Sequence, residues 1–452
     1  MKKGEIYEGK VIKTTFPNKG IVFIDDKKIT VKGALTGQNI TFSIKKNRAD
    51  HAEGRLLKVN SSSPLEDTNP ICPHFNQCGG CTYQSLSYTN QLNLKESQVK
   101  ELLDSLEIPY IWEGIKGSPV QEEYRNKMEF SFGDEYKDGP LALGMHKKNS
   151  FHDIVSIEQC KIVPEDYNMI LKATLDYCTQ KEYPFYKKML HTGLLRHLVI
   201  RRSVKSNDIL VNIVTTDSQP FDSKEYVKVL LDLKINGTII GIIHTINNSL
   251  ADVVQSDKMT LLYGNDYFIE NILNLNFRVS PFSFFQTNSL GAEVLYETAR
   301  SYVGETKDKV IFDLYSGTGT IAQILAPTAS KVIGIEIIEE AVEAAKINAN
   351  LNKLHNCEFI AGDVLSKIDE INVKPDIIVV DPPRSGINPK AIKKIAGYGI
   401  DEIIYISCNP ASLTNDIKEF SQYGYKLKRA CAVDMFPNTV HVETVALLSI
   451  EN

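Results

Sequence analysis

The chain has 452 residues, of which 42% are hydrophobic and 24% charged, as is typical of a globular protein large enough for two or three domains. No apolar run reaches the roughly 18 residues of a membrane span, and the start of the chain lacks the apolar core of a signal peptide. We therefore expect a cytoplasmic protein without a membrane partner, whose eight cysteines are free, metal-bound or catalytic. The net charge of −5 does not indicate a nucleic-acid binder, although a local basic face is enough to bind phosphate.

Residues 1–58 have the pattern of a small basic β domain. Short β-like runs at 6–11, 20–24 and 28–31 alternate with Gly and Asn turns at the spacing of a small barrel. The lysines that make this part basic are Lys10, Lys13, Lys19, Lys27, Lys28, Lys45 and Lys46. The stretch 60–64 is a linker by composition. We predict an OB-like β-barrel that binds RNA, with a stabilising appendage as the alternative.

Residues 65–275 are predicted to form a β-rich central domain. A helix over about 87–106 has apolar residues near one face, and we expect it to pack on the catalytic domain that follows. Two segments, 124–127 and 196–202, interleave basic residues with aromatic or strand-forming apolar ones. The candidate RNA contacts in them are Arg125, Lys127, Arg196, Arg201 and Arg202. A solvated strand face with scattered charge would give the same pattern.

Four cysteines of the central domain form a candidate metal site. Cys72, Cys78 and Cys81 lie in one turn-rich stretch, where two glycines at 79 and 80 allow the backbone to wrap closely around an ion or cluster. The fourth, Cys160, lies 79 residues further on. Four thiolates also suit zinc, which is the safer assignment from spacing alone, but zinc sites usually offer two close Cys-x2-Cys pairs. The spacing therefore leaves both zinc and an iron–sulfur cluster open.

From about residue 280 to residue 452 the pattern changes to alternating strands and helices. Strand-like runs occur at 310–314, 331–336, 358–360, 376–380 and 402–406. This alternation predicts a doubly wound parallel sheet, an α/β Rossmann-like domain. Two further β-runs, 426–433 and 440–448, are joined by a turn with no room for a helix. A terminal antiparallel hairpin fits a methyltransferase better than a dinucleotide dehydrogenase.

A glycine loop follows the first of these strands. Gly317 and Gly319 let the backbone approach a ligand closely, and Glu336, at the end of the next strand, can bind both hydroxyls of a ribose. The third glycine of a dinucleotide loop is missing. Asp313 at the end of the first strand favours S-adenosylmethionine, which carries an ammonium group. Asp363 is positioned to bond the adenine amino group or, alternatively, to cap a helix.

A thiol and a carboxylate follow two later strands. Cys408 stands in Ser-Cys-Asn-Pro and Asp381 in Asp-Pro-Pro-Arg, both at strand ends, where α/β enzymes carry their reactive groups. The C5 carbon of uracil is too weakly nucleophilic to take a methyl group unaided. A thiolate that adds at C6 activates C5, and a base must later remove the C5 proton. The alternative is that Cys408 is a small buried apolar residue.

With these motifs in order, the chain resembles the RNA (uracil-5-)-methyltransferases, in particular the group that acts on 23S rRNA. The likeness covers nearly the whole chain, because the N-terminal part is similar to a TRAM domain and the four cysteines are similar to that group's [4Fe-4S] ligands. It implies that Cys408 is the nucleophile, that Glu443 is the general base, and that Asp381 also helps to hold the target base. The cofactor contacts that it implies are Gln286, Tyr315, Thr320, Glu336, Asp363 and Asp381.

The expected reaction is therefore methyl transfer from S-adenosylmethionine to C5 of uridine in 23S rRNA, through a covalent Cys408–C6 adduct. An amino-methyltransferase would carry Pro-Pro-Tyr after the fourth strand, where this chain has Pro-Pro-Arg384. Two alternatives stay open: a tRNA uracil-5-methyltransferase, and a non-catalytic RNA-binding assembly factor on the same scaffold. We expect RNA as the partner, a [4Fe-4S] cluster as a second cofactor, and a monomer.

Overall fold

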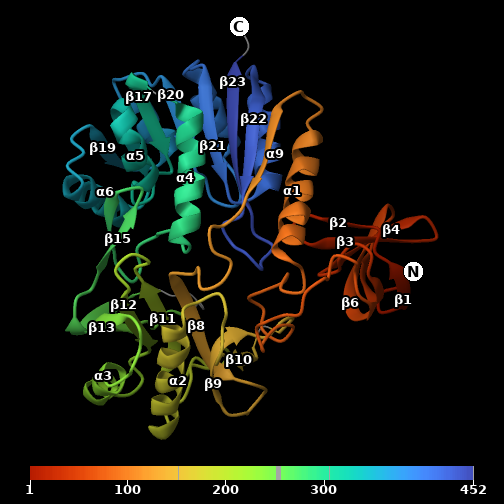
Figure 1. Cartoon of the computed structure of the whole chain (residues 1–452), viewed down its shortest axis with the longest axis vertical. Coiled ribbons are helices and arrows are strands. Elements are labelled where there is room, and N and C mark those ends of the chain that lie inside the picture. The colour runs from red at the N-terminus through yellow and green to blue at the C-terminus, as the bar shows by residue number, and fades with distance from the viewer. Residues whose placement is uncertain (151, 251–255, 305, 451–452) are drawn as a thin grey trace.

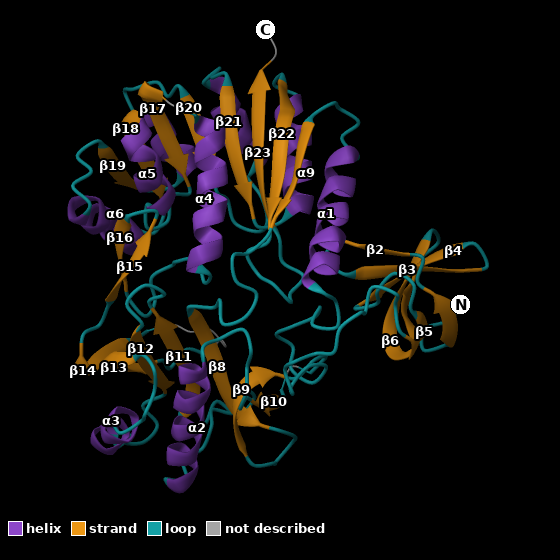
Figure 2. Cartoon of the chain, viewed as in Figure 1, coloured by secondary structure: helices purple, strands orange, loops and turns teal. Residues whose placement is uncertain are grey.

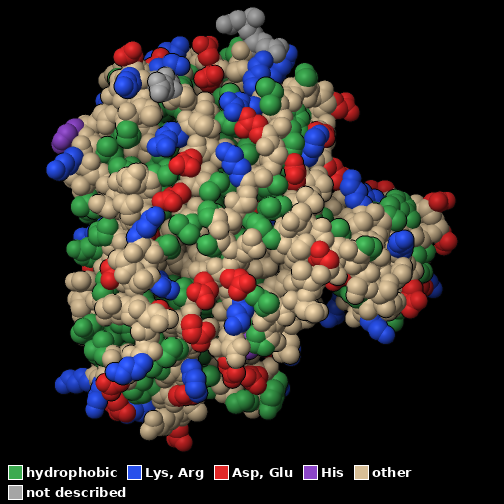
Figure 3. Space-filling model, in the orientation of Figure 1, with side chains coloured by type: hydrophobic (Ala, Val, Ile, Leu, Met, Phe, Trp, Pro, Cys, Tyr) green, Lys and Arg blue, Asp and Glu red, His purple; other side chains and the backbone are tan. Residues whose placement is uncertain are grey.

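The computed structural model of the chain describes residues 1–150, 152–250, 256–304 and 306–450. They form a large α/β body with helices on both faces of its sheet, a central body below it, and a small β domain at the side (Figure 1). None of the helices within these ranges is both long and apolar enough to cross a membrane. Figure 3 shows acidic and basic side chains interspersed over the visible face of the α/β body.

The α/β body is built on an eight-stranded mixed sheet. In sheet order its strands are β19 (Cys357–Ala361), β18 (Ala329–Glu336), β17 (Thr306–Leu314), β20 (Ile377–Val380), β21 (Glu402–Ser407), β23 (Glu443–Ile450), β22 (Tyr425–Val433) and β7 (Ile111–Lys116). The first five are parallel, and β23 runs antiparallel to both of its neighbours. All four residues of β20 are buried, as expected for a strand covered on both faces. The predicted doubly wound sheet with a terminal antiparallel hairpin is confirmed.

Two layers of helices cover this sheet (Figure 2). One core contains side chains of α4 (Ser289–Val303), α5 (Thr320–Leu325) and α6 (Glu339–Leu351). The other core contains side chains of α1 (Tyr88–Asp104), α7 (Val364–Lys367), α8 (Pro389–Gly397) and α9 (Pro410–Ser421). Short 3-10 turns extend α5 and α7, over Ala326–Thr328 and Ile368–Glu370. Alternate residues of β17, such as Ile311 and Phe312, point to the two cores.

Segments from outside residues 280–452 also belong to this body. Val99 and Leu103 of α1 lie in the second core, and β7 pairs in parallel with β22 at the sheet edge. The hairpin of β15 (Phe268–Ile272) and β16 (Leu275–Val279) contributes Phe268 and Phe277 to the first core. The chain therefore enters the α/β body, leaves it for the central body, and returns.

The central body is a seven-stranded sheet with two helices. Its strands in order are β10 (Ile154–Ser156), β9 (Leu141–His146), β8 (Lys127–Asp134), β11 (Leu195–Arg202), β12 (Asp208–Thr215), β13 (Thr238–Ile246) and β14 (Lys258–Gly264), and its helices are α2 (Glu165–Gln180) and α3 (Ser223–Leu231). Almost every residue of β11 and β12 is buried, which makes them the centre of this core. The C-terminal end of β11 lies toward the α/β body, where the Arg201 side chain donates a hydrogen bond to the carbonyl of Pro281.

The N-terminal residues form a separate β domain. Its strands in sheet order are β1 (Ile6–Lys10), β5 (Asn39–Asn47), β6 (His51–Ser61), β4 (Lys27–Lys32), β3 (Lys19–Ile24) and β2 (Lys13–Thr15). Val22, Ile29 and Phe42 are fully buried in its core. The sheet is a half-barrel rather than the closed barrel that the sequence predicts, because β1 and β2 remain at its two edges.

Candidate active site

A cavity of about 1050 Å³ lies at the carboxyl ends of β17, β18, β20 and β21, and Arg125 of the central body also lines it. Ligands of open α/β sheets bind at this edge. The residues of the wall that the sequence predicted are Gln286, Tyr315, Gly317, Thr320, Glu336, Asp363, Asp381, Cys408 and Glu443. Gly319, the remaining residue of the predicted loop, lies behind the wall as the N-cap of α5.

The glycine loop after β17 has a left-handed backbone. Gly317 and Gly319 have φ angles of +54° and +72°, and a Cβ at Gly319 would lie 2.5 Å from the Phe359 ring. Tyr315 has a φ of +65°, a strained value for a bulky residue of the kind that clusters at binding sites. The loop therefore needs glycine where it passes over the sheet, and it follows the sheet edge closely.

Two carboxylates lie in the cavity wall beside this loop. Glu336 ends β18, and its two oxygens accept hydrogen bonds from the backbone N–H groups of Gly317 and Ile338, each at 3.0 Å. Asp363 lines the cavity and is also the N-cap of α7, with Oδ1 accepting from Leu365 at 3.4 Å. Both functions that the sequence allowed for Asp363, a ligand contact and a helix cap, are thus compatible with one position.

Asp313 is a buried acid beneath the loop. It is fully buried, and its Oδ2 accepts the N–H of Ala322 at 2.9 Å. Its Oδ1 has no hydrogen-bond partner among the described residues, nor has the buried hydroxyl of Ser316. Burial and the nearby Asp381 raise the pKa of Asp313 to about 8. A buried acceptor without a partner suits a ligand that brings an ammonium group.

The segment 280–287 closes the other side of the cavity and is held by the central body. The side chain of Asn126 donates to the carbonyl of Gln286 at 2.9 Å, and its backbone N–H donates to Thr287 at 2.9 Å. Arg201 donates to the carbonyls of Pro281 and Ser283. Phe284, in the same segment, is 68% exposed and lines the cavity mouth. The central body therefore fixes the segment that carries Gln286.

Cys408 lies between the end of β21 and the N-cap of α9, Asn409. Asn409 and Ser412 both donate to the carbonyl of Arg384, at 2.9 and 2.8 Å, and so join the start of α9 to the loop after β20. Burial raises the pKa of the Cys408 thiol to about 11, with further contributions from Glu443 and Asp381 and an opposing one from Arg384. Without a ligand the thiol is therefore protonated at neutral pH.

Two carboxyl groups share the cavity with this thiol. Burial raises the pKa of Asp381 to about 7, and burial together with Asp381 raises the pKa of Glu443 to about 8. The Arg384 guanidinium acts against the second of these shifts. Acids with such values can hold or release a proton near neutral pH, as a general acid or base must.

His441 and Phe436 complete the wall near Cys408, and the sequence analysis did not single them out. Their rings meet edge to face at 6.1 Å between centroids. Burial, with Arg384, Lys95 and Arg125 nearby, lowers the pKa of His441 to about 4, so the imidazole is neutral at pH 7. The signal that the sequence offers for them is proximity to Glu443, which His441 precedes by two residues and Phe436 by seven.

The four candidate metal-binding cysteines line one small cavity in the central body. The N–H of Gly80 points to Cys78 Sγ at 3.3 Å, the kind of contact that stabilises a thiolate. Burial raises the pKa of Cys81 to about 12 and that of Cys160 to about 11. Within the described part of the chain, no three His, Cys, Asp or Glu side chains converge closely enough to hold a single metal ion. Arg125 lies in the wall of this cavity and also in the wall of the cavity that contains Cys408.

The candidate RNA contacts differ in exposure. Arg201 is 2% exposed and is bonded to the 281–283 carbonyls, and Arg196 is 3% exposed, with its guanidinium 4.4 Å from the Tyr186 ring centroid. Lys127 pairs with Glu129 at 2.5 Å, and Arg202 lies 3.7 Å from Asp166. Arg125, in the wall of the catalytic cavity, is thus the best placed of the five for a substrate.

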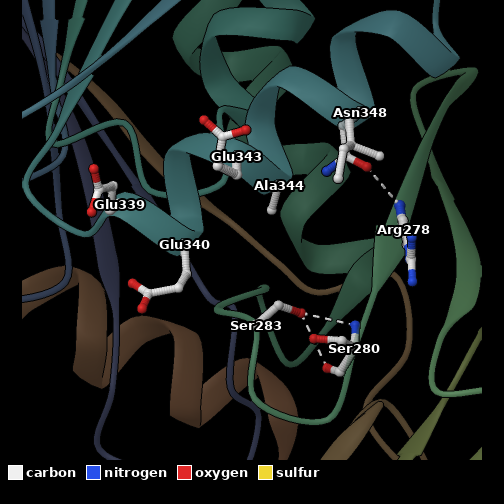
Figure 4. A pocket seen from close by; sticks show the side chains of 9 residues that line it. Arg278, Ser280, Ser283, Glu339, Glu340, Glu343, Ala344 and Asn348 are labelled. Atoms are coloured by element: carbon white, nitrogen blue, oxygen red, sulfur yellow. Dashed lines mark hydrogen bonds between the residues drawn. The ribbon is translucent and has the colours of Figure 1, made fainter.

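A second cavity, of about 510 Å³, adjoins the first along α6. Figure 4 shows Glu339, Glu340 and Glu343 on the first turns of this helix, and the backbone N–H of Arg278 bonded to Asn348. The two cavities share Ser280, Ser283, Glu340 and Ala344. The second cavity is therefore a side extension of the first.

A doubly wound sheet, with a Gly-x-Gly loop after its first strand and an acid at the end of the second, is the architecture of the Rossmann-like methyltransferases. Residues 87–451 match the family model described as tRNA (Uracil-5-)-methyltransferase. The chain therefore belongs to the tRNA (uracil-5-)-methyltransferase family.

Similar proteins and structures extend over the full length. An uncharacterized RNA methyltransferase of Clostridium tetani is 48% identical over 98% of each chain, and one of Caldanaerobacter subterraneus subsp. tengcongensis is 47% identical over 99% of each. The crystal structure of Pyrococcus abyssi tRNA (uracil-54, C5)-methyltransferase in complex with S-adenosyl-L-homocysteine superimposes with a TM-score of 0.76. It is 26% identical and covers 97% of this chain and 100% of its own.

Proposed function

We propose that the protein transfers a methyl group from S-adenosylmethionine to C5 of a uridine in RNA, and that Cys408 is the nucleophile. The observation that carries this proposal is the common cavity of Cys408, Asp381 and Glu443 with the glycine loop and Glu336. A sulfonium methyl donor bound against the loop and Glu336 would share this cavity with the thiol. Asp313, with its free buried oxygen, would face the ammonium end of that donor.

The steps follow from the chemistry of uracil. The Cys408 thiolate adds to C6, and the electron pair of the C5=C6 bond moves onto C5 and the adjoining carbonyl. C5 then bonds to the methyl carbon, and the carbon–sulfur bond of the donor breaks with its electrons left on sulfur. Glu443 accepts the C5 proton, the double bond re-forms, and Cys408 leaves as a thiolate. Asp381, in the wall of the same cavity, would hold the ring through its polar edge.

The protonation states limit when this chemistry can begin. In the ligand-free cavity the pKa values of Cys408, about 11, and Glu443, about 8, both favour the neutral form. A cation close to them favours the thiolate and the carboxylate. The sulfonium group of S-adenosylmethionine is such a cation, whereas the thioether of the product is neutral. The reactive form of the site would therefore arise only with methyl donor bound.

For the substrate we propose 23S rRNA. The N-terminal half-barrel supports an RNA partner, because residues 1–58 hold 13 Lys and Arg against 6 Asp and Glu, a net charge of +7 in a chain with −5 overall. Its similarity to a TRAM domain and the four-cysteine set favour the rRNA-modifying group that the sequence resembles. A tRNA substrate is the second candidate, because the Pyrococcus abyssi neighbour acts on tRNA by its description.

We further propose a [4Fe-4S] cluster held by Cys72, Cys78, Cys81 and Cys160. All four line one cavity, and each of them would bind a different iron, so they need not converge on one point as the ligands of a zinc ion do. The cluster would supply a covalent cross-link between two distant segments.

Anaerobically purified protein should be brown with about four irons per chain, and stoichiometric zinc in its place would overturn the assignment.

A covalent trap and a modification map test the reaction and the substrate separately. RNA with 5-fluorouridine at the target lacks the C5 proton, so the enzyme should remain bound to it through a bond that survives denaturation. No adduct with any RNA would refute the catalytic proposal and favour an RNA-binding assembly factor. Mapping 5-methyluridine in rRNA and tRNA from cells with and without the protein should show a loss in 23S rRNA. A loss confined to tRNA would refute the substrate proposal alone.

A further inference from the structure

The loop of residues 434–439, which we call the clamp loop, directly precedes His441 and Glu443. Four of its consecutive carbonyl groups accept a hydrogen bond from a different part of the chain. Met435 accepts from Asn288 of α4 at 2.8 Å, Phe436 from Lys95 of α1 at 3.1 Å, Pro437 from Tyr124 at 2.9 Å, and Asn438 from Thr82 and Tyr83 at 2.7 and 3.0 Å. This single loop thus contacts both bodies and the cysteine-bearing segment.

The contacts with α1 are the most specific. Asn438 and Gln91 form a reciprocal amide pair, in which Gln91 Nε2 donates to Asn438 Oδ1 at 3.0 Å and the Asn438 N–H donates to Gln91 Oε1 at 2.7 Å. One helical turn further, Lys95 pairs with Asp434 at 2.7 Å, and both side chains are fully buried. A buried ion pair fixes geometry strictly, because neither partner can move without leaving the other uncompensated.

The contact with the cysteine-bearing segment is equally direct. Thr82 and Tyr83 follow Cys81, and both backbone N–H groups converge on the carbonyl of Asn438. Asn438 has a φ of +67°, a left-handed conformation that Asn tolerates better than most residues. The placement of the four-cysteine cavity is therefore linked to the clamp loop through two hydrogen bonds to one residue.

The clamp loop ends in the catalytic cavity. Phe436 lines that cavity, and the His441 N–H donates to Thr439 Oγ1 at 3.2 Å, two residues before Glu443 begins β23. A shift of the loop therefore moves the ring pair of Phe436 and His441 together with the entry to β23. The cofactor loop and Glu336 lie on other strands and are not bonded to Asn438 in the described structure.

We propose that Asn438 is a positioning residue for the step in which Glu443 removes the C5 proton and Cys408 is released. By holding the clamp loop against α1 and the segment after Cys81, Asn438 sets the place of Glu443 relative to the methylated adduct. This inference rests on the proposed function. It assigns to the four-cysteine segment a part in active-site geometry, in addition to cross-linking the central body.

Two variants and one control test this inference in the full-length protein. Asn438→Gly removes the side chain and keeps the left-handed backbone, and Gln91→Met removes the other half of the amide pair. The control is Asn274→Gly, an exposed Asn with a φ of +66° in the β15–β16 turn, outside the clamp loop. Each protein is mixed under single-turnover conditions with methyl-labelled S-adenosylmethionine and an rRNA transcript that the wild type methylates. Labelled covalent adduct and released 5-methyluridine are then followed separately.

Both clamp variants should form labelled adduct at close to the wild-type rate and release it about tenfold or more slowly, because small displacements of a catalytic group cost this much. The KM for S-adenosylmethionine should stay within about twofold, since the cofactor wall is not bonded to Asn438. The control should behave as the wild type. Normal release by both variants, or equal loss of adduct formation and release, would overturn the inference alone. Absence of a covalent adduct between the wild type and the same transcript carrying 5-fluorouridine would overturn the proposed function, and this inference with it.

Discussion

Cys408 and Glu443 each lie next to one member of the same antiparallel residue pair, because Ser407 of β21 lies opposite Thr444 of β23. The nucleophile and the candidate base are thus held by one hydrogen-bonded ladder. β23 reaches this position because it lies between β21 and β22 and pairs antiparallel with both. The antiparallel strand at the end of the fold therefore has a catalytic consequence: it brings a carboxyl group from the end of the chain beside a thiol on β21.

The different tasks of these two residues give the first prediction. Cys408→Ala should bind RNA but form no covalent adduct, because the bond to C6 cannot form. Glu443→Gln should accumulate a methylated adduct that survives denaturation, because proton removal lacks its base. Denaturing gels with labelled methyl donor measure both outcomes. If Glu443→Gln turned over normally with no trapped species, the base would have to be another group.

The buried acids should make the stability of the ligand-free protein depend on pH. The pKa of Glu443 is raised from 4.5 to about 8, so between these values the folded state binds more protons than the unfolded state. Stability is therefore present at low pH and decreases as pH rises through about 8. Replacing the group by the neutral amide in Glu443→Gln should reduce this dependence. Melting temperatures from pH 5 to pH 9 should fall less steeply for Glu443→Gln than for the wild type, and parallel curves would count against the raised pKa.

The charge of the methyl donor should control the reactivity of Cys408. Burial and two neighbouring carboxyl groups hold the pKa of this thiol at about 11, and a nearby cation would lower it. Iodoacetamide should therefore modify Cys408 slowly in the free protein and in the complex with S-adenosylhomocysteine. Sinefungin, an unreactive analogue with a positive amino group in place of the sulfonium, should increase the rate. Peptide mass spectrometry assigns the label to Cys408.

The sequence predicted the parts of this site that depend on strand ends. Asp381, Cys408 and Glu336 each follow an apolar run, and in a parallel sheet the carboxyl ends of such runs share one edge. Their common cavity follows from topology alone. The contacts of Asn438 with Gln91, across 347 positions, do not follow, because no local pattern encodes a pairing between distant loops.

The basic residues of β11 show a second limit of prediction from sequence. The run from Leu195 to Arg202 is almost entirely buried, so that its arginines enter the protein instead of facing solvent. Arg201 satisfies buried carbonyls at Pro281 and Ser283, a contact that needs the α/β body in place. Charge in a sequence predicts a cation but not the direction of its side chain. The half-barrel shows the same limit, because periodicity gives strands without specifying whether a sheet closes.

The last prediction concerns Gly319, which the sequence assigned to the cofactor and the structure places behind the cavity wall. A Cβ here would lie 2.5 Å from Phe359 and 2.8 Å from Ala345 Cβ, and its φ of +72° disfavours any side chain. Gly319→Ala should lower the free energy of unfolding by about 2 to 4 kcal/mol, from overpacking and left-handed strain together. The matched control is Gly399→Ala, at a φ of +57° with nothing within 4 Å of its Cβ, which should cost about 1 kcal/mol. Urea unfolding measures both. The affinity for S-adenosylhomocysteine, measured by calorimetry on the folded variants, should fall only in Gly319→Ala, because only there does the loop have to shift. Equal affinities in the two variants would mean that the loop binds the cofactor without depending on its packing against Phe359.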